Sequence, residues 1–229
     1  MTFDAGAGFK YNTSKFLSLS EYCKYYFGEY MLATATIADL LRPSEKRSAA
    51  VYDITLVLGG SLLIALCARI TILLPFSPVP VTAQTFAVLM TGALLGANRG
   101  GLAALAYIIQ GALGLPVFAL GGGPAVLLGP TGGYLIGFIP AAYVTGILAQ
   151  KGWDRRIGTT VLAMIFGNIV IYTFGMLWLS RLMGISKSIL ATGLYPFIVG
   201  DLAKIALAAA VLPAGWKLLK YGGFDCKRR

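Results

Sequence analysis

The sequence predicts an all-α membrane protein of six transmembrane helices with both termini in the cytoplasm. Only 12% of its 229 residues are charged, whereas 57% are hydrophobic. A water-soluble domain carries about 25% charged residues, because its surface has to be solvated by water. The stretch from residue 100 to residue 150 contains no charged residue at all. Lipid is therefore the solvent that this chain requires, and apolar helices can cross it.

Six apolar segments account for the predicted crossings. A helix rises about 1.5 Å per residue, so about 20 residues span a hydrocarbon core of about 30 Å. The second and fourth segments are short for a full span, which leaves their boundaries soft. The predicted segments are residues 54–74, 81–97, 100–120, 133–150, 157–180 and about 189–216.

The basic residues predict the orientation. Fifteen of the nineteen Lys and Arg residues fall on one side of the membrane if the N-terminus is inside. Positive residues stay preferentially in the cytoplasm during insertion, so both termini are predicted there. The cytoplasmic basic residues are six within residues 1–50, Arg99, Lys151, Arg155, Arg156 and five within residues 217–229.

Composition divides the chain into three parts. Residues 1–50 are a polar extension without the early apolar core of a signal peptide, and we expect it in the cytoplasm. Residues 51–220 form the six-helix transmembrane domain, in which we expect the substrate to bind. Residues 221–229 are a basic cytoplasmic tail. Within the first helix, Ser61 and Ala65 are a pair of small residues four apart, which suits either packing inside the molecule or a docking face for a partner.

Several functions are excluded for want of suitable side chains. The net charge of +10 comes from residues scattered between apolar segments, so nucleic-acid binding is not expected. Histidine is absent, which removes the commonest general base and metal ligand. The sequence has no phosphate-binding loop of the G-x-x-x-x-G-K-[ST] type, and no intramembrane pair of carboxylates. We therefore predict neither an enzyme nor a protein with a cofactor or a metal.

Two charged residues interrupt the last apolar segment. Asp201 and Lys204 each cost about 2.5 to 3.5 kcal/mol on membrane-insertion scales. Their i, i+3 spacing places them on one helix face, within reach of each other. They are either a self-neutralising pair or a polar ligand site in the interior of the bundle. Pro196 suits the first turn of this helix, so a site at Asp201 would open to the outside.

Uncharged polar residues in other segments are further candidates for this site. Gln84 in the second segment and Asn168 in the fifth have amides that require partners in lipid. Tyr107 in the third segment is a weaker candidate. Each of them could equally serve a hydrogen bond between helices or, for Tyr107, packing or the membrane interface.

Three motifs stand in order along the chain: SPVPVTAQTF at 77–86, GALGLPVF at 111–118 and LGPTGGY at 128–134, and a D-x-x-K pair follows at Asp201 and Lys204. Together they strongly resemble the BioY family, the biotin-specific S components of energy-coupling-factor (ECF) transporters. The resemblance covers about residues 54–218. It implies a six-helix S-component-like bundle in the lipid of a bacterial plasma membrane. It also implies high-affinity biotin capture and uptake, with Asp201 and Lys204 in the biotin site and Gln84 at a matching motif position.

The resemblance further implies partners. A transmembrane coupling protein and two ATPase subunits are expected, or a homo-oligomer if the protein works alone. Biotin has two ureido N–H donors, a ureido carbonyl, an apolar bicycle and a carboxylate. Asp201, helped by Asn168 or Gln84, would receive the ureido group while Lys204 neutralises the carboxylate; the reverse division stays open. Two other functions stay open too: a self-sufficient ion-coupled carrier of a small carboxylate-bearing solute, in which Asp201 titrates, and a structural membrane protein.

Overall fold

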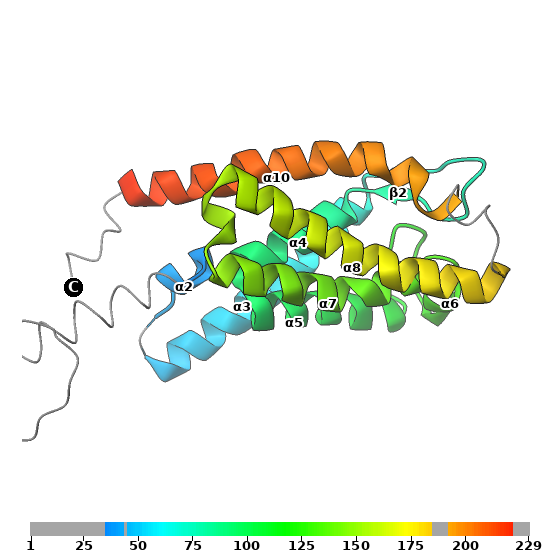
Figure 1. The fold of residues 1–229 in the computed structure, drawn as a ribbon. Helices are drawn as coiled ribbons and strands as arrows, with labels where there is room; N and C mark the ends of the chain where they lie inside the picture. The colour runs from blue at the N-terminus through cyan, green and yellow to red at the C-terminus, as the bar shows by residue number, and fades with distance from the viewer. Residues whose placement is uncertain (1–34, 44, 185–191, 222–229) are drawn as a thin grey trace, which may run out of the picture. The chain divides into compact units, whose positions relative to one another are not determined.

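The chain folds mainly into helices, shown in Figure 1 as a computed structural model that describes residues 35–43, 45–184 and 192–221. Short strands and turns join them. In chain order the elements are α2 (Ile37–Leu40), α3 (Lys46–Ala68), β1 (Thr71–Ile72), β2 (Val81–Thr82), α4 (Gln84–Leu95), α5 (Ala97–Ala112), α6 (Pro124–Leu128), α7 (Gly132–Gln150), the 3-10 turn η1 (Trp153–Arg155), α8 (Ile157–Met183) and α10 (Tyr195–Tyr221).

Four helices of the described part, α3, α7, α8 and α10, are long and apolar enough to cross a membrane. The helices α4 and α5 have 12 and 16 residues. At 1.5 Å per residue they are about 18 and 24 Å long, less than the hydrocarbon thickness of about 30 Å. Each predicted segment overlaps one of these six helices. The helical membrane class is thus confirmed, whereas six complete crossings and cytoplasmic termini stay predictions.

The first two predicted segments were too long at the ends that face each other. The chain leaves α3 at Ala68, and β1 then pairs antiparallel with β2, Thr71 opposite Thr82 and Ile72 opposite Val81. These residues are β-branched, which favours strands over helices. The hairpin therefore delays the start of α4 to Gln84. The third predicted segment was also too long at its C-terminal end. Helix α5 already ends at Ala112, because Gly114 (φ +94°) and Pro116 follow.

Helix α7 forms the centre of the bundle. It packs against α4, α5 and α8, and it is the most buried of the four long apolar helices, whereas α3 is the least buried. Gly92 on α4 allows the close approach, because a Cβ there would lie 2.3 Å from the carbonyl oxygen of Ala142 on α7. Close helix packing in lipid depends on such small residues.

Ser61 and Ala65 face the interior of the molecule. Ser61 is fully buried and Ala65 is 8% exposed. The Ser61 hydroxyl donates a hydrogen bond to Gln110 Oε1 on α5, at 2.9 Å. Of the two uses predicted for this pair of small residues, packing inside the molecule is confirmed, and a docking face is wrong.

A charge cluster joins α2, α3 and α5. The Arg99 guanidinium contacts Asp39 at 2.7 Å and Asp53 at 2.8 Å, and Arg42 contacts Asp53 at 2.7 Å. Burial acts to raise the pKa of Asp39. Hydrogen bonds from Thr36 and the charge of Arg99 outweigh that effect and hold the pKa below its usual value. The cluster fixes the start of α5 against the segment that leads into α3.

The boundary between the predicted extension and the transmembrane domain falls inside a helix. Helix α3 begins at Lys46, before the predicted boundary at residue 50, and α2 precedes it. The rest of the predicted extension, residues 1–34, and the predicted tail from residue 222 onward lie outside the described residues.

Candidate functional site

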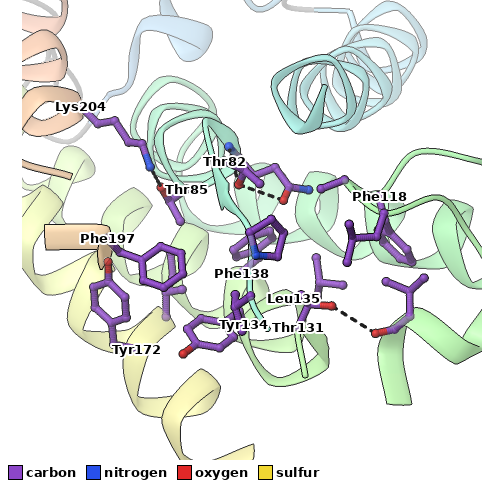
Figure 2. A pocket seen from close by; sticks show the side chains of 17 residues that line it. Thr82, Thr85, Phe118, Thr131, Tyr134, Leu135, Phe138, Tyr172, Phe197 and Lys204 are labelled. Atoms are coloured by element: carbon purple, nitrogen blue, oxygen red, sulfur yellow. Dashed lines mark hydrogen bonds between the residues drawn. The ribbon is translucent and has the colours of Figure 1, made fainter. Parts of the chain in front are cut away.

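A cavity lies between α4, α7, α8 and α10, beside the segments that connect the helices (Figure 2). The cavity has a volume of about 560 Å³ if its open mouth is included. Only about 40 Å³ of this volume can be reached by the centre of a water molecule, and this smaller value is the one to compare with other binding sites. Small-molecule sites usually measure about 300–1,000 Å³. The lining side chains are therefore closely drawn together, and they have to separate to admit a ligand.

The first motif, residues 77–86, builds one wall of this cavity. The Ser77 hydroxyl lies 2.6 Å from the Thr192 carbonyl and 3.2 Å from the Val79 amide. These contacts hold the segment before β2 against the start of α10. Five residues of this motif line the cavity: Val79, Pro80, Thr82, Gln84 and Thr85.

Lys204 and its neighbours form a charged end. The Lys204 ammonium donates to Asp201 Oδ1 at 3.0 Å and to Thr85 Oγ1 at 2.9 Å. The Tyr172 hydroxyl donates to Asp201 Oδ2. Lys204, Thr85 and Tyr172 line the cavity, whereas Asp201 lies behind them and is 5% exposed. The predicted proximity of Asp201 and Lys204 is thus confirmed, and Figure 2 shows Lys204 reaching Thr85.

Gln84 occupies a second polar position. Its Oε1 accepts a hydrogen bond from Thr82 Oγ1 at 3.1 Å, and its Nε2 donates to the Tyr107 hydroxyl. Tyr107 in turn donates to the Val117 carbonyl at 3.2 Å and is fully buried. Gln84 lines the cavity, and Tyr107 fixes Gln84 from behind.

Asn168 lies apart from the other four candidates. It lines a smaller cavity, which shares only Thr85 and Lys204 with the first. The structure therefore brings Gln84 and Lys204 to the main cavity, places Asp201 and Tyr107 directly behind its wall, and leaves Asn168 on the other side of Lys204.

Aromatic rings line much of the main cavity. Tyr134 has its ring centroid 6.5 Å from that of Tyr172 and 6.2 Å from that of Phe197, and its hydroxyl donates to the Gly193 carbonyl at 2.8 Å. Phe118 and Phe138 complete the aromatic part of the lining (Figure 2). Such faces suit a flat apolar ligand body.

Sequence reasoning did not place five of the lining residues at the site: Phe118, Thr131, Tyr134, Phe138 and Phe197. Phe118 and Thr131 lie inside the second and third motifs, so the motifs contained a signal for them. Tyr134 also lies in the third motif. Nothing in the sequence marked Phe138 or Phe197.

A turn after the C-terminal end of α5 carries Phe118 to the cavity. Phe118 and Gly121 exchange backbone hydrogen bonds of 2.9 and 3.1 Å, and the Gly123 amide donates to the Gly111 carbonyl at 2.7 Å. The Arg69 guanidinium at the end of α3 donates to the Pro116 carbonyl. The turn is thus tied to both α5 and α3.

Comparison with known proteins gives consistent matches. A sequence profile of the BioY family matches residues 42–221. A biotin transporter BioY from Rhizobium etli is 39% identical over 160 residues, which cover 66% of this chain and 86% of that protein. Its counterpart from Thermotoga maritima is 40% identical over 139 residues, covering 60% and 81%.

A solved structure matches as well. The crystal structure of the S-component for biotin from an ECF-type ABC transporter superposes with a TM-score of 0.65. It is 28% identical in sequence, and the match covers 81% of this chain and 100% of the solved one.

Proposed function

The chain belongs to the BioY family, and from that premise we propose that it takes up biotin as the substrate-specificity component of a vitamin transporter. It is a multi-pass membrane protein and a transporter component, not an enzyme. The observation that carries the proposal is the aromatic-walled cavity with Lys204, Thr85 and Tyr172 at one end and Gln84 along its wall.

The chemistry of biotin matches this lining. Its bicycle is apolar and suits the rings of Tyr134, Phe138 and Phe197. Its ureido group needs donors for one carbonyl and acceptors for two N–H groups. Lys204 supplies donors, and the hydroxyl of Thr85 and the carbonyl of Gln84 supply acceptors, all on the cavity wall.

The charge balance at Lys204 favours one orientation of the ligand. Asp201 already neutralises the ammonium at 3.0 Å, so this end of the cavity is polar without carrying a net charge. An uncharged ureido group suits such a place better than a carboxylate does, because a buried excess charge is costly. We therefore place the ureido carbonyl at Lys204 and the carboxylate toward the open mouth, with Asp201 acting through Lys204.

The proposal also includes the source of energy for transport and the membrane in which the protein works. We propose that a transmembrane coupling protein and two ATPase subunits drive transport, in the plasma membrane of a bacterium. The match to an S-component of an ECF-type transporter supports such partners. A homo-oligomer is the alternative assembly.

Substitution of Lys204 tests the ligand site. We expect Lys204→Ala to weaken retention of labelled biotin by about tenfold to a hundredfold, the usual effect of losing a hydrogen bond from a charged group. The measurement is equilibrium binding of labelled biotin to purified protein.

Lys217→Ala is the matched control, because Lys217 is an exposed lysine at the other end of the same helix. Its retention should equal that of the wild type. Lys204→Arg preserves the positive charge beside Asp201 and serves if the alanine variant does not insert. Undiminished retention in Lys204→Ala, or in Lys204→Arg if the alanine variant does not insert, would refute the assignment.

A further inference from the structure

A second, smaller cavity lies beside the main one, on the other side of Lys204 and Thr85. The centre of a water-sized sphere can move through about 10 Å³ of it. This is about the space that one buried water molecule requires. Thr85, Lys204 and Asn168 contribute its polar atoms, and the rest of its lining is apolar.

We call this smaller cavity the inner cavity, and helix periodicity explains where it lies. Side chains four residues apart share a helix face. Asn168 therefore lies one turn before Tyr172 along α8, and Leu89 one turn after Thr85 along α4. Both Asn168 and Leu89 line the inner cavity, whereas Tyr172 lines the main one. The inner cavity is thus the next layer of the same bundle interior.

Asn168 brings an unused acceptor to this layer. The residue is 7% exposed, and its Oδ1 has no hydrogen-bond partner among the described residues. Buried carbonyl oxygens are almost always paired, with protein or with ordered water. An amide oxygen in this position therefore points to a bound polar group.

Lys204 brings the complementary donor. An ammonium has three N–H groups, and two of them point to Asp201 and Thr85. A cation in the inner cavity would be repelled by the ammonium, and the space is too small for a larger solute. A neutral molecule of the size of water is the ligand that fits both the volume and the charge.

We propose that the inner cavity binds one water molecule, which accepts a hydrogen bond from the Lys204 ammonium and donates one to Asn168 Oδ1. Resting on the proposed function, this inference makes Asn168 a positioning residue for biotin capture. Asn168 completes the hydrogen bonds of Lys204 from the far side without touching the ligand.

Two substitutions at this position separate hydrogen bonding from packing. Asn168→Leu removes the acceptor but keeps a side chain that branches at Cγ, so retention of labelled biotin should fall about tenfold. Asn168→Thr keeps an uncharged oxygen acceptor at similar volume, and it should restore retention to within about twofold of the wild type. Equal losses in both variants, accompanied by equal losses in melting temperature, would mean a purely structural role and overturn the inference.

Thr145→Val is the matched control. Thr145 Oγ1 is also buried and unpartnered within the described residues, but Thr145 lines neither cavity. Its substitution should leave retention unchanged. A loss in Thr145→Val as large as in Asn168→Leu would overturn the inference, because any buried polar deletion would then have the same effect.

A high-resolution structure of the wild-type protein tests the water directly. The expected result is one water molecule within hydrogen-bond distance of both Asn168 Oδ1 and Lys204 Nζ. An empty inner cavity, or Asn168 bonded directly to protein, would overturn the inference. A wild-type protein that retains no biotin would instead refute the proposed function, and the structure would still decide the inference.

Discussion

Asp201 supports the cavity from behind its wall. Its carboxylate accepts from Tyr172 and Lys204, and Thr85 lies 3.5 Å away. The carboxylate thus compensates the charge of Lys204 and orients two residues that face the ligand. Removing one partner of a buried ion pair costs about 3–5 kcal/mol, because the other charge is left without compensation.

Substitutions at Asp201 and Tyr172 should therefore reduce biotin retention by different amounts. Asp201→Asn leaves the Lys204 ammonium uncompensated, and we expect it to weaken biotin retention and lower the melting temperature strongly. Tyr172→Phe removes one hydrogen bond but keeps the ring in the aromatic wall, so its loss of retention should be at least about tenfold smaller. Binding of labelled biotin and thermal unfolding of both variants provide the comparison. Equal losses would contradict the supporting role of Asp201.

Helix α10 is the element that links the site to the far end of the bundle. Near its start, Asp201 contacts Tyr172 of α8. Near its other end, the Trp216 indole donates to Asp154 Oδ2 of η1 at 2.5 Å, and the Arg155 guanidinium lies 4.6 Å from the centre of the Trp216 ring. The helix that carries Lys204 is thus held at both ends by a polar contact to a neighbouring element.

The contact between Trp216 and Asp154 should respond to pH. Burial raises the pKa of Asp154 to about 6, although the Trp216 hydrogen bond acts in the opposite direction. A carboxyl whose pKa is raised in the folded state contributes stability at low pH, which is lost as the pH rises through about 6. Between pH 5 and pH 7 the loss is about 1 kcal/mol, or about 2–4 °C in melting temperature.

Asp154→Asn provides the test, because its amide oxygen still accepts from Trp216 and does not titrate. Melting temperatures at pH 5 and pH 7 should fall with rising pH in the wild type and remain level in the variant. Asp39 does not interfere, since its pKa is lowered and its effect is confined to more acidic solutions. An identical pH dependence in both proteins would contradict the assignment.

At the scale of the whole molecule, the sequence determined the class and part of the site. Charge-poor segments predicted the helices, and the i, i+3 spacing predicted the contact of Asp201 with Lys204, because both depend on local periodicity. The placement of Asn168 was not predictable in this way. Periodicity tells which residues share a helix face, but the rotation of α8 against α4 and α10 decides which cavity that face meets. The β1–β2 hairpin was missed because short apolar strands resemble helix ends in hydropathy.

The central claim is that the cavity beside Lys204 binds one biotin molecule. Native mass spectrometry of the protein, purified from membranes supplied with biotin, measures this most directly. The account predicts a complex heavier by the mass of one biotin in the wild type and in Lys217→Ala, and its loss in Lys204→Ala. A different bound mass in the wild type, no bound mass, or biotin fully retained by Lys204→Ala would contradict it.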